Sequence, residues 1–219
     1  MILWADLQTD IASCRGCVRQ WPTLVAQPLS AGEIPNPPKV TLLFVGVAPT
    51  PIEGKNKGMH FYSSTRDPLR TALFQMLDSL LDDSDLRQKD KTGKSAGDAA
   101  FHERGLFFVH AAKIRPISHS APPRAVMRFC ARQHLAQEIE SLQPKVVCFL
   151  GATNARPAAV ELFGDNIEEV PDASLGQWRG KVVLAPQPVR AGKAAAPAIL
   201  RRALAGAGGR GTGWTGLMP

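Results

Sequence analysis

The chain has 219 residues, of which 44% are hydrophobic and 21% charged, a balance that suits one α/β domain with a sizeable core and is short for two complete domains. No apolar run approaches the ~20 residues of a membrane span, and Met1–Asp6 lacks the basic and apolar regions of a secretory signal, so we expect a cytoplasmic protein that contacts no membrane. The formal net charge of +7 favours phosphate-bearing partners, because each neutralised phosphate releases counterions, although a basic surface that only keeps the protein soluble would carry the same charge.

Strands and helices alternate along the chain in the predicted pattern. The first strand, Val40–Val45, is a continuous apolar run of the buried parallel kind. Asp67 and Pro68 then supply the N-cap and the first residue of a helix. The later predicted elements are strands at 106–110, 145–151 and 182–185, helices at about 124–141 and 154–162, a hairpin within 167–186 that turns at 179–180, and a final helix around 199–204.

Two segments read as irregular. Residues 82–105 are polar and rich in Lys, Asp and Gly, which predicts a mobile insertion. Residues 206–219 are glycine-rich and predict a disordered tail. The remaining pattern predicts one domain over 1–205, a three-layer α/β/α fold with a central, mainly parallel four-stranded sheet. Ligands bind beyond the carboxyl ends of such strands.

The segments expected at those strand ends carry motifs in a definite order. Gly46–Thr50 reads Gly-Val-Ala-Pro-Thr, and Gly58–Phe61 reads Gly-Met-His-Phe. Val109–Pro116 contains Lys-Ile-Arg-Pro, and Cys130–Gly151 combines a helix with a following apolar strand. The last segment, Gln187–Val189, reads Gln-Pro-Val. In this order the motifs resemble those of the uracil-DNA glycosylase superfamily, and most closely its iron–sulfur branches, families 4 and 5.

The resemblance implies hydrolysis of the N-glycosidic bond of uracil or another deaminated base in DNA, as in base excision repair. It makes DNA that contains such a base the expected partner, and we expect the protein to be a monomer. The reaction passes through an oxocarbenium-like sugar and an anionic leaving base, so the site must stabilise both charges and place a water. The base must first leave the duplex, which requires a stacking ring and polar groups for its pairing edge.

Four positions that carry chemistry in the family hold other residues here. Val47 stands where family 4 has the glutamate that positions the attacking water, which makes it a degenerate catalytic position. Ser64 stands where family 5 has an aspartate. His110 replaces the asparagine that pairs with the everted base, and Gln187 replaces the histidine that stabilises the leaving base. Glu53 is the carboxylate that we would test as a substitute at the water position.

The resemblance also assigns the residues that would bind the base. They are Gly46, Ala48, Pro49, Phe61, His110 and Gln187. We expect Phe61 to stack on the base, His110 to donate a hydrogen bond to it or steady its anion, and Gln187 to read it as donor and acceptor. Backbone groups of 46–50 would place the water. The alternatives are a core phenylalanine, a core histidine and a surface glutamine.

Basic residues flank the first and last motifs. Those expected to contact DNA phosphates are Lys55, Lys57, Arg190 and Lys193. For each of them, solvated surface charge is the alternative.

Three cysteines match ligand positions of the family's iron–sulfur cluster. Cys14 and Cys17 form a C-x-x-C pair, Cys130 is the third, and Ile114 stands where a further cysteine is expected. His119 is the candidate that could supply a nitrogen ligand in its place. Three options stay open: a [4Fe–4S] cluster with an unusual fourth ligand, a zinc site of the Cys₃His type, or no metal. We expect some metal to be bound, because three related thiols are retained.

Two further functions are compatible with the sequence. One is a non-catalytic nucleic-acid-binding protein that kept the fold and lost the reaction. The other is a nucleotide-handling enzyme on a similar sheet. It has less support because no phosphate-cradling glycine-rich loop precedes a helix.

Overall fold

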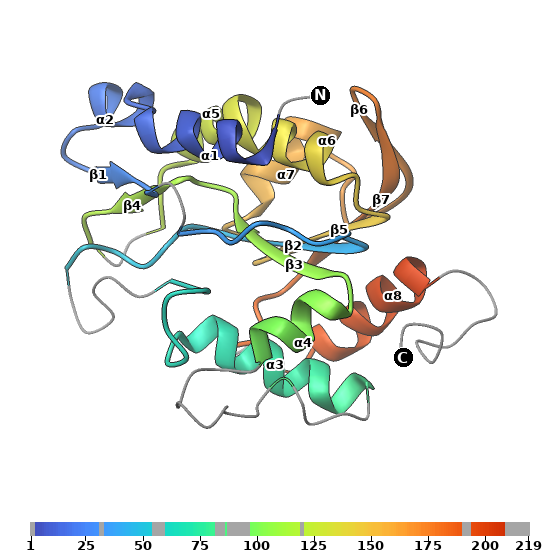
Figure 1. The fold of residues 1–219 in the computed structure, drawn as a ribbon. Coiled ribbons are helices and arrows are strands. Elements are labelled where there is room, and N and C mark those ends of the chain that lie inside the picture. The colour runs from blue at the N-terminus through green and yellow to red at the C-terminus, as the bar shows by residue number, and fades with distance from the viewer. Residues whose placement is uncertain are drawn as a thin grey trace.

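The computed structural model describes residues 3–30, 33–53, 60–81, 86, 97–118, 121–189 and 194–208. Two layers of helices enclose a central sheet (Figure 1). One face is covered by α1 (Trp4–Ser13), α2 (Gly16–Gln20), α5 (Arg124–Cys130), α6 (Ala136–Leu142) and α7 (Arg156–Phe163). The other face is covered by α3 (Pro68–Leu81), α4 (Gly97–Glu103) and α8 (Ala196–Gly208). The predicted three-layer α/β/α architecture is confirmed.

The central sheet has five strands in the order β3-β2-β5-β7-β6, one more than the four predicted. Four of them are parallel neighbours, as predicted: β2 (Leu42–Gly46), β3 (Leu106–His110), β5 (Val146–Leu150) and β7 (Trp178–Ala185). The fifth, β6 (Glu169–Leu175), is an antiparallel edge strand paired with β7. A separate pair, β1 (Val25–Pro28) with β4 (Ile114–Pro116), is antiparallel.

The predicted turn of the hairpin at 179–180 is wrong. Arg179 and Gly180 lie inside β7, where they pair with Ser174 and Ala173 of β6. The chain turns instead at Gly176, whose φ of 52° is a left-handed conformation that glycine adopts without steric cost. The turn therefore falls where the backbone needs a glycine, three residues before the predicted position.

Helices lie where the apolar pattern predicts them, but the structure also has a π-helical turn and two N-terminal helices that were not predicted. Asp67 caps α3 as predicted, since its carboxylate accepts a hydrogen bond from the Arg70 backbone N–H at 2.8 Å. The long helix predicted at 124–141 is interrupted by a π-helical turn, Ala131–Leu135, between α5 and α6. The helices α1 and α2 were not predicted.

The predicted mobile insertion ends in an ordered helix. In α4, Phe101 is fully buried and Asp98 forms an ion pair with the buried Arg70 of α3. That prediction is therefore wrong for 97–105, because one aromatic residue and one buried cation hold the helix against the core. Of 82–96, only Leu86 lies among the described residues, and it is buried. The helix α8 extends to Gly208, three residues into the predicted tail, and 209–219 lie outside the described residues.

Alternate residues of the strands enter two separate cores. Leu43, Phe107 and Val147 face α1 and α5–α7, whereas Phe44, Phe108 and Cys148 face α3, α4 and α8. Both faces of the sheet are thus filled with hydrocarbon. Polar chemistry is left to the strand ends and the loops that follow them.

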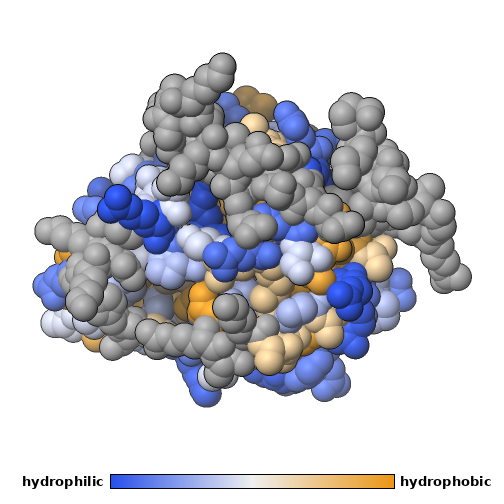
Figure 2. Space-filling view, turned by 90° about the horizontal axis from the view of Figure 1, so that it is seen from below, coloured by the Kyte–Doolittle hydropathy of each residue, from blue (hydrophilic) through white to orange (hydrophobic). Residues whose placement is uncertain are grey.

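The outer surface carries few large apolar side chains. Among the described residues, the exposed large hydrophobic side chains are Leu3 and Leu24. On the α3–α8 face, hydrophobic and hydrophilic residues are interspersed (Figure 2), and α3 and α8 contribute the half-buried Leu69, Leu80 and Ile199. In the part of the chain that the structure describes, no helix is long and apolar enough to span a membrane.

Candidate active site

The carboxyl ends of β2 and β3 bring the first and second motifs together. Gly46 and His110 are the last residues of the two strands and stand opposite each other in register. Beyond them the pairing continues, because the Gly46 carbonyl accepts a hydrogen bond from the Ala111 N–H at 2.8 Å. A β-carbon on Gly46 would lie 2.5 Å from the Phe108 ring and 3.4 Å from His110 Nδ1. The His110 imidazole therefore packs directly against the strand end that begins the first motif.

Val47 after β2 and Gln187 after β7 both border Gly151, which follows β5 between them. A β-carbon on Gly151 would lie 3.2 Å from Val47 Cγ2 and 3.4 Å from Gln187 Cγ. Gly151 also has a φ of 119°, which residues with a side chain rarely adopt. Glycine at this position thus leaves the space in which the two predicted site residues approach each other.

His110 is a buried, neutral imidazole. It is 6% exposed, and its ring makes an edge contact with Phe108 at a centroid distance of 4.9 Å. Burial lowers the pKa of His110 well below 6.5, and the positive charges of Lys113 and Arg115, and of His60 when it is protonated, lower it further. Neither ring nitrogen has a hydrogen-bond partner among the described residues. A neutral imidazole offers one donor and one acceptor, so a ligand that reached His110 could use both.

Phe61 lies in the core in this conformation. It is 1% exposed, and its ring stacks on Phe108 with centroids 4.0 Å apart and an interplanar angle of 8°. Phe74 and Phe101 pack around the same ring. A base could stack on Phe61 only after Phe108 moved, so the stacking role stays a prediction with that added condition.

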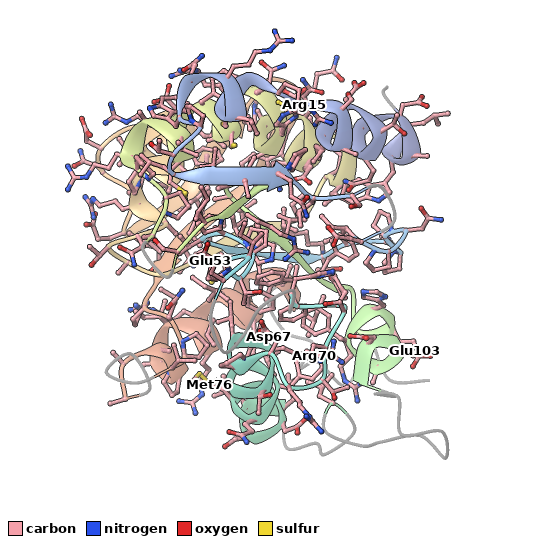
Figure 3. The ribbon with its side chains drawn as sticks, turned by 90° about the vertical axis from the view of Figure 1, so that its left-hand side faces the viewer. Arg15, Glu53, Asp67, Arg70, Met76 and Glu103 are labelled. Atoms are coloured by element: carbon pink, nitrogen blue, oxygen red, sulfur yellow. The ribbon has the colours of Figure 1, made fainter. Side chains whose placement is uncertain are left out.

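The remaining residues of the first motif line a loop above the sheet. Pro49 is buried and Ala48 is half-buried. The hydroxyl of Ser64 accepts a hydrogen bond from the Arg66 N–H at 3.2 Å, so it serves a local turn. Glu53 is exposed and lies close to the level of the sheet, with Asp67 and Arg70 below it on the α3 side (Figure 3).

A charged network of Arg115, Glu33 and His60 joins this loop to residues that are distant in sequence. Arg115 donates a hydrogen bond to Glu33 Oε1 at 2.6 Å and reaches the Thr50 carbonyl oxygen at 3.5 Å. The same Glu33 oxygen lies 3.7 Å from His60 Nε2. Burial lowers the pKa of His60, while the charge of Glu33 opposes that shift. Arg115 lies in the Lys-Ile-Arg-Pro motif, so the sequence could have indicated this side of the network. Its partner Glu33 lies 82 positions away and carries no such motif.

An open cavity of about 710 Å³, lined mainly by residues that carry a polar group, adjoins the network and is called the polar cavity below. Its lining residues are Glu33, Pro35, His60, Tyr62, Ser63, Asp98 and His102. The cavity lies beside β3, whose Phe108 N–H donates a hydrogen bond to the Tyr62 hydroxyl at 2.9 Å. It is large enough to admit part of a nucleotide.

A model of the family described as the uracil DNA glycosylase superfamily matches residues 34–204, which include all five strands of the central sheet. The chain belongs to this superfamily. No match was found among curated proteins. The match begins after α1 and α2, so Cys14 and Cys17 lie outside it, and membership of the iron–sulfur branches stays a prediction.

The glycosylase motifs also include residues that the structure does not describe. Lys55, Lys57, Arg190 and Lys193, the predicted phosphate contacts, lie outside the described residues, and so does His119.

Two of the three cysteines that resemble glycosylase cluster ligands meet in the structure. Cys17 and Cys130 are buried with their sulfur atoms 3.6 Å apart, and Cys14 is half-buried. The hydrogen bond between the pair raises the pKa of Cys17. No group of three Cys, His, Asp or Glu side chains among the described residues is arranged to hold a metal, and Ile114 is buried. These residues do not fit a four-thiolate cluster, and no step below uses one.

A buried ion pair lies behind the candidate site. The Lys113 ammonium pairs with the Glu138 carboxylate and also donates a hydrogen bond to the His110 carbonyl oxygen. Burial lowers the pKa of Lys113, and Glu138 opposes that shift. The pair thus fixes the backbone that carries His110.

Proposed function

We propose that this protein is a DNA glycosylase that hydrolyses the N-glycosidic bond of uracil or another deaminated base in DNA. The observation that carries the proposal is the His110 side chain, a buried neutral imidazole at the end of β3 with both ring nitrogens unpartnered among the described residues. By the resemblance of its motif, it stands where superfamily enzymes have the asparagine that pairs with the everted base. An N–H donor there would strengthen its hydrogen bond as negative charge develops on the base.

The remaining roles follow from position. Gln187, which approaches Val47 over Gly151, would bind the pairing edge of the base through its amide. Backbone groups of the Gly46–Thr50 loop line the same strand end. Basic residues near the motifs would contact the DNA phosphates, which makes binding sensitive to salt.

A second function is favoured by two specific observations. Val47 offers only methyl groups where the family 4 glutamate positions water, and Phe108 covers the ring that would stack on the base. Both would follow if the protein binds DNA without cleaving it. The alternative is therefore a non-catalytic nucleic-acid-binding protein on the glycosylase fold.

Base release from defined oligonucleotides separates the two functions. Single- and double-stranded substrates with uracil, hypoxanthine or xanthine are incubated with the protein, and alkali then cleaves any abasic site. We expect cleavage that falls at least about 100-fold in His110→Ala, the usual loss on removing a donor that stabilises developing negative charge. His134→Ala is the matched control, because it removes an equally buried imidazole from the π-helical turn. Salt-sensitive binding without cleavage on every substrate would instead establish the non-catalytic function.

A further inference from the structure

The proposed hydrolysis needs a group that holds the attacking water. Val47 cannot do so, since its side chain is hydrocarbon and is packed near Gly151. A carboxylate is nevertheless linked to the first-motif loop through an arginine. Glu33 is bound to Arg115, and Arg115 reaches the carbonyl oxygen of Thr50, the last residue of that motif.

Glu33 and His60 are each held in place by independent contacts. Glu33 Oε2 accepts a hydrogen bond from the Ser30 N–H at 2.8 Å, while its Oε1 accepts the bond from Arg115. The His60 backbone N–H donates to Ser63 Oγ at 3.0 Å, and the His60 carbonyl accepts from the Ser63 N–H at 3.0 Å. Both side chains face the polar cavity. The two groups are therefore preorganised on the same wall of a space open to a ligand.

The separation between the two side chains suits a third group between them. Glu33 Oε1 and His60 Nε2 are 3.7 Å apart, which is beyond a direct hydrogen bond. A single water can accept or donate a hydrogen bond to both atoms at such a distance. The carboxylate accepts only, whereas a neutral imidazole can accept a proton, so the pair can both orient a water and deprotonate it.

We propose that Glu33 and His60 together hold and deprotonate the water that attacks the sugar, in place of the carboxylate absent at Val47. This inference rests on the proposed function. In the step, the C1′–N bond breaks and the base leaves with its electron pair, to be protonated by solvent. The water oxygen bonds to C1′, and its proton passes to His60, which becomes an imidazolium beside Glu33. The products are an abasic site and a free base.

The surroundings of His60 keep it able to accept that proton. Burial is the main cause that lowers its pKa below 6.5, Arg115 lowers it further, and Glu33 raises it. Among the described residues, the other titratable groups near it are His110 on β3 and, in the lining of the same cavity, Tyr62, Asp98 and His102. His60 is therefore neutral near pH 7, and once protonated it is stabilised by the adjacent carboxylate.

Single-turnover rates between pH 5 and 8 on the best oligonucleotide substrate test this assignment. We expect His60→Ala to lose at least about 100-fold in rate, with DNA affinity unchanged and no fall in the residual rate toward acid. Glu33→Gln should lower the plateau and move the acid limb to lower pH, since it removes the charge that raises the pKa of His60. The control His134→Gln replaces a buried imidazole in the π-helical turn, outside the residues that line the cavity, and it should keep the wild-type profile.

Each outcome decides between the inference and the function on which it rests. Wild-type activity with an unchanged rate and pH profile in His60→Ala overturns the water site and leaves the glycosylase function standing. An inactive wild-type protein overturns both. If His60→Ala does not fold, as judged by circular dichroism, Glu33→Gln alone decides, and an unmoved acid limb in that variant rejects the inference.

Discussion

Replacing Lys113 by methionine measures what the buried ion pair behind the site contributes to stability. Lys113 is 1% exposed and its partner Glu138 is fully buried. Methionine is similar in length but carries no charge, so the variant leaves Glu138 as a buried carboxylate without its cation. Breaking a buried pair in this way costs about 3–5 kcal/mol. We therefore expect the free energy of unfolding of Lys113→Met to fall by about that amount.

Urea unfolding followed by tryptophan fluorescence is the assay, with Glu138→Met and the double variant as controls. The double variant removes both charges and should recover most of the lost stability, because an apolar pair of similar volume replaces the ion pair at little cost. Burial raises the pKa of Glu138, and Lys113 opposes that shift. In the single variant the folded pKa of Glu138 is higher still, so the loss of stability should shrink as pH falls toward 4.5. A double variant as unstable as the single one would refute this account.

Three further predictions concern the metal, the strand end and the acid stability. Purified protein should lack the brown colour and visible absorption of an iron–sulfur cluster, since Ile114 stands where a further thiolate would be needed and no three candidate ligands among the described residues are arranged to hold a metal; a coloured sample that loses iron to chelators would contradict this. Gly151→Ala should lower the free energy of unfolding by about 1–3 kcal/mol and reduce base release, because its φ is 119° and the added methyl crowds Val47 and Gln187. Burial lowers the pKa of His134 to about 4, so folding loses stability as pH falls from 6.5 to 4, by up to about 3 kcal/mol; His134→Gln should flatten that slope in urea titrations at pH 7 and 4.5, and an unchanged slope would reject it.

The sequence predicted the parallel sheet because each strand is a short apolar run that is buried on both faces. Val146–Leu150 is an example, with every residue buried. The sequence did not predict structure in segments of polar composition that a few specific contacts hold in place. In α4, a polar stretch becomes an ordered helix because Phe101 fills the core and Asp98 meets Arg70. The short strands β1 and β4 were also missed, since three or four residues carry too little periodicity to predict pairing.

The sequence predicted which residues of the candidate site lie at the carboxyl ends of the strands. His110 meets Gly46 at the ends of two neighbouring parallel strands, and Val47 and Gln187 both border Gly151 at the end of β5, as expected for carboxyl ends of one parallel sheet. Side-chain direction was not predictable. The ring of Phe61 is turned onto Phe108, a contact set by core packing. Nor could the sequence connect Glu33 with Arg115, whose hydrogen bond spans 82 positions of the chain.

The two sides of His110 differ in a way that bears on how such a site could change its chemistry. On the Gly151 side, position 47 is packed near a glycine and Gln187, so a carboxylate there would pay a large desolvation cost without a cation beside it. On the other side, Glu33 already has Arg115 as its cation and borders a polar cavity. The strands fix only the backbone, and any side chain that reaches the space beside the sugar can hold the water. A hydrocarbon residue at position 47 is therefore compatible with hydrolysis as long as the Glu33–Arg115 pair keeps a carboxylate next to His60.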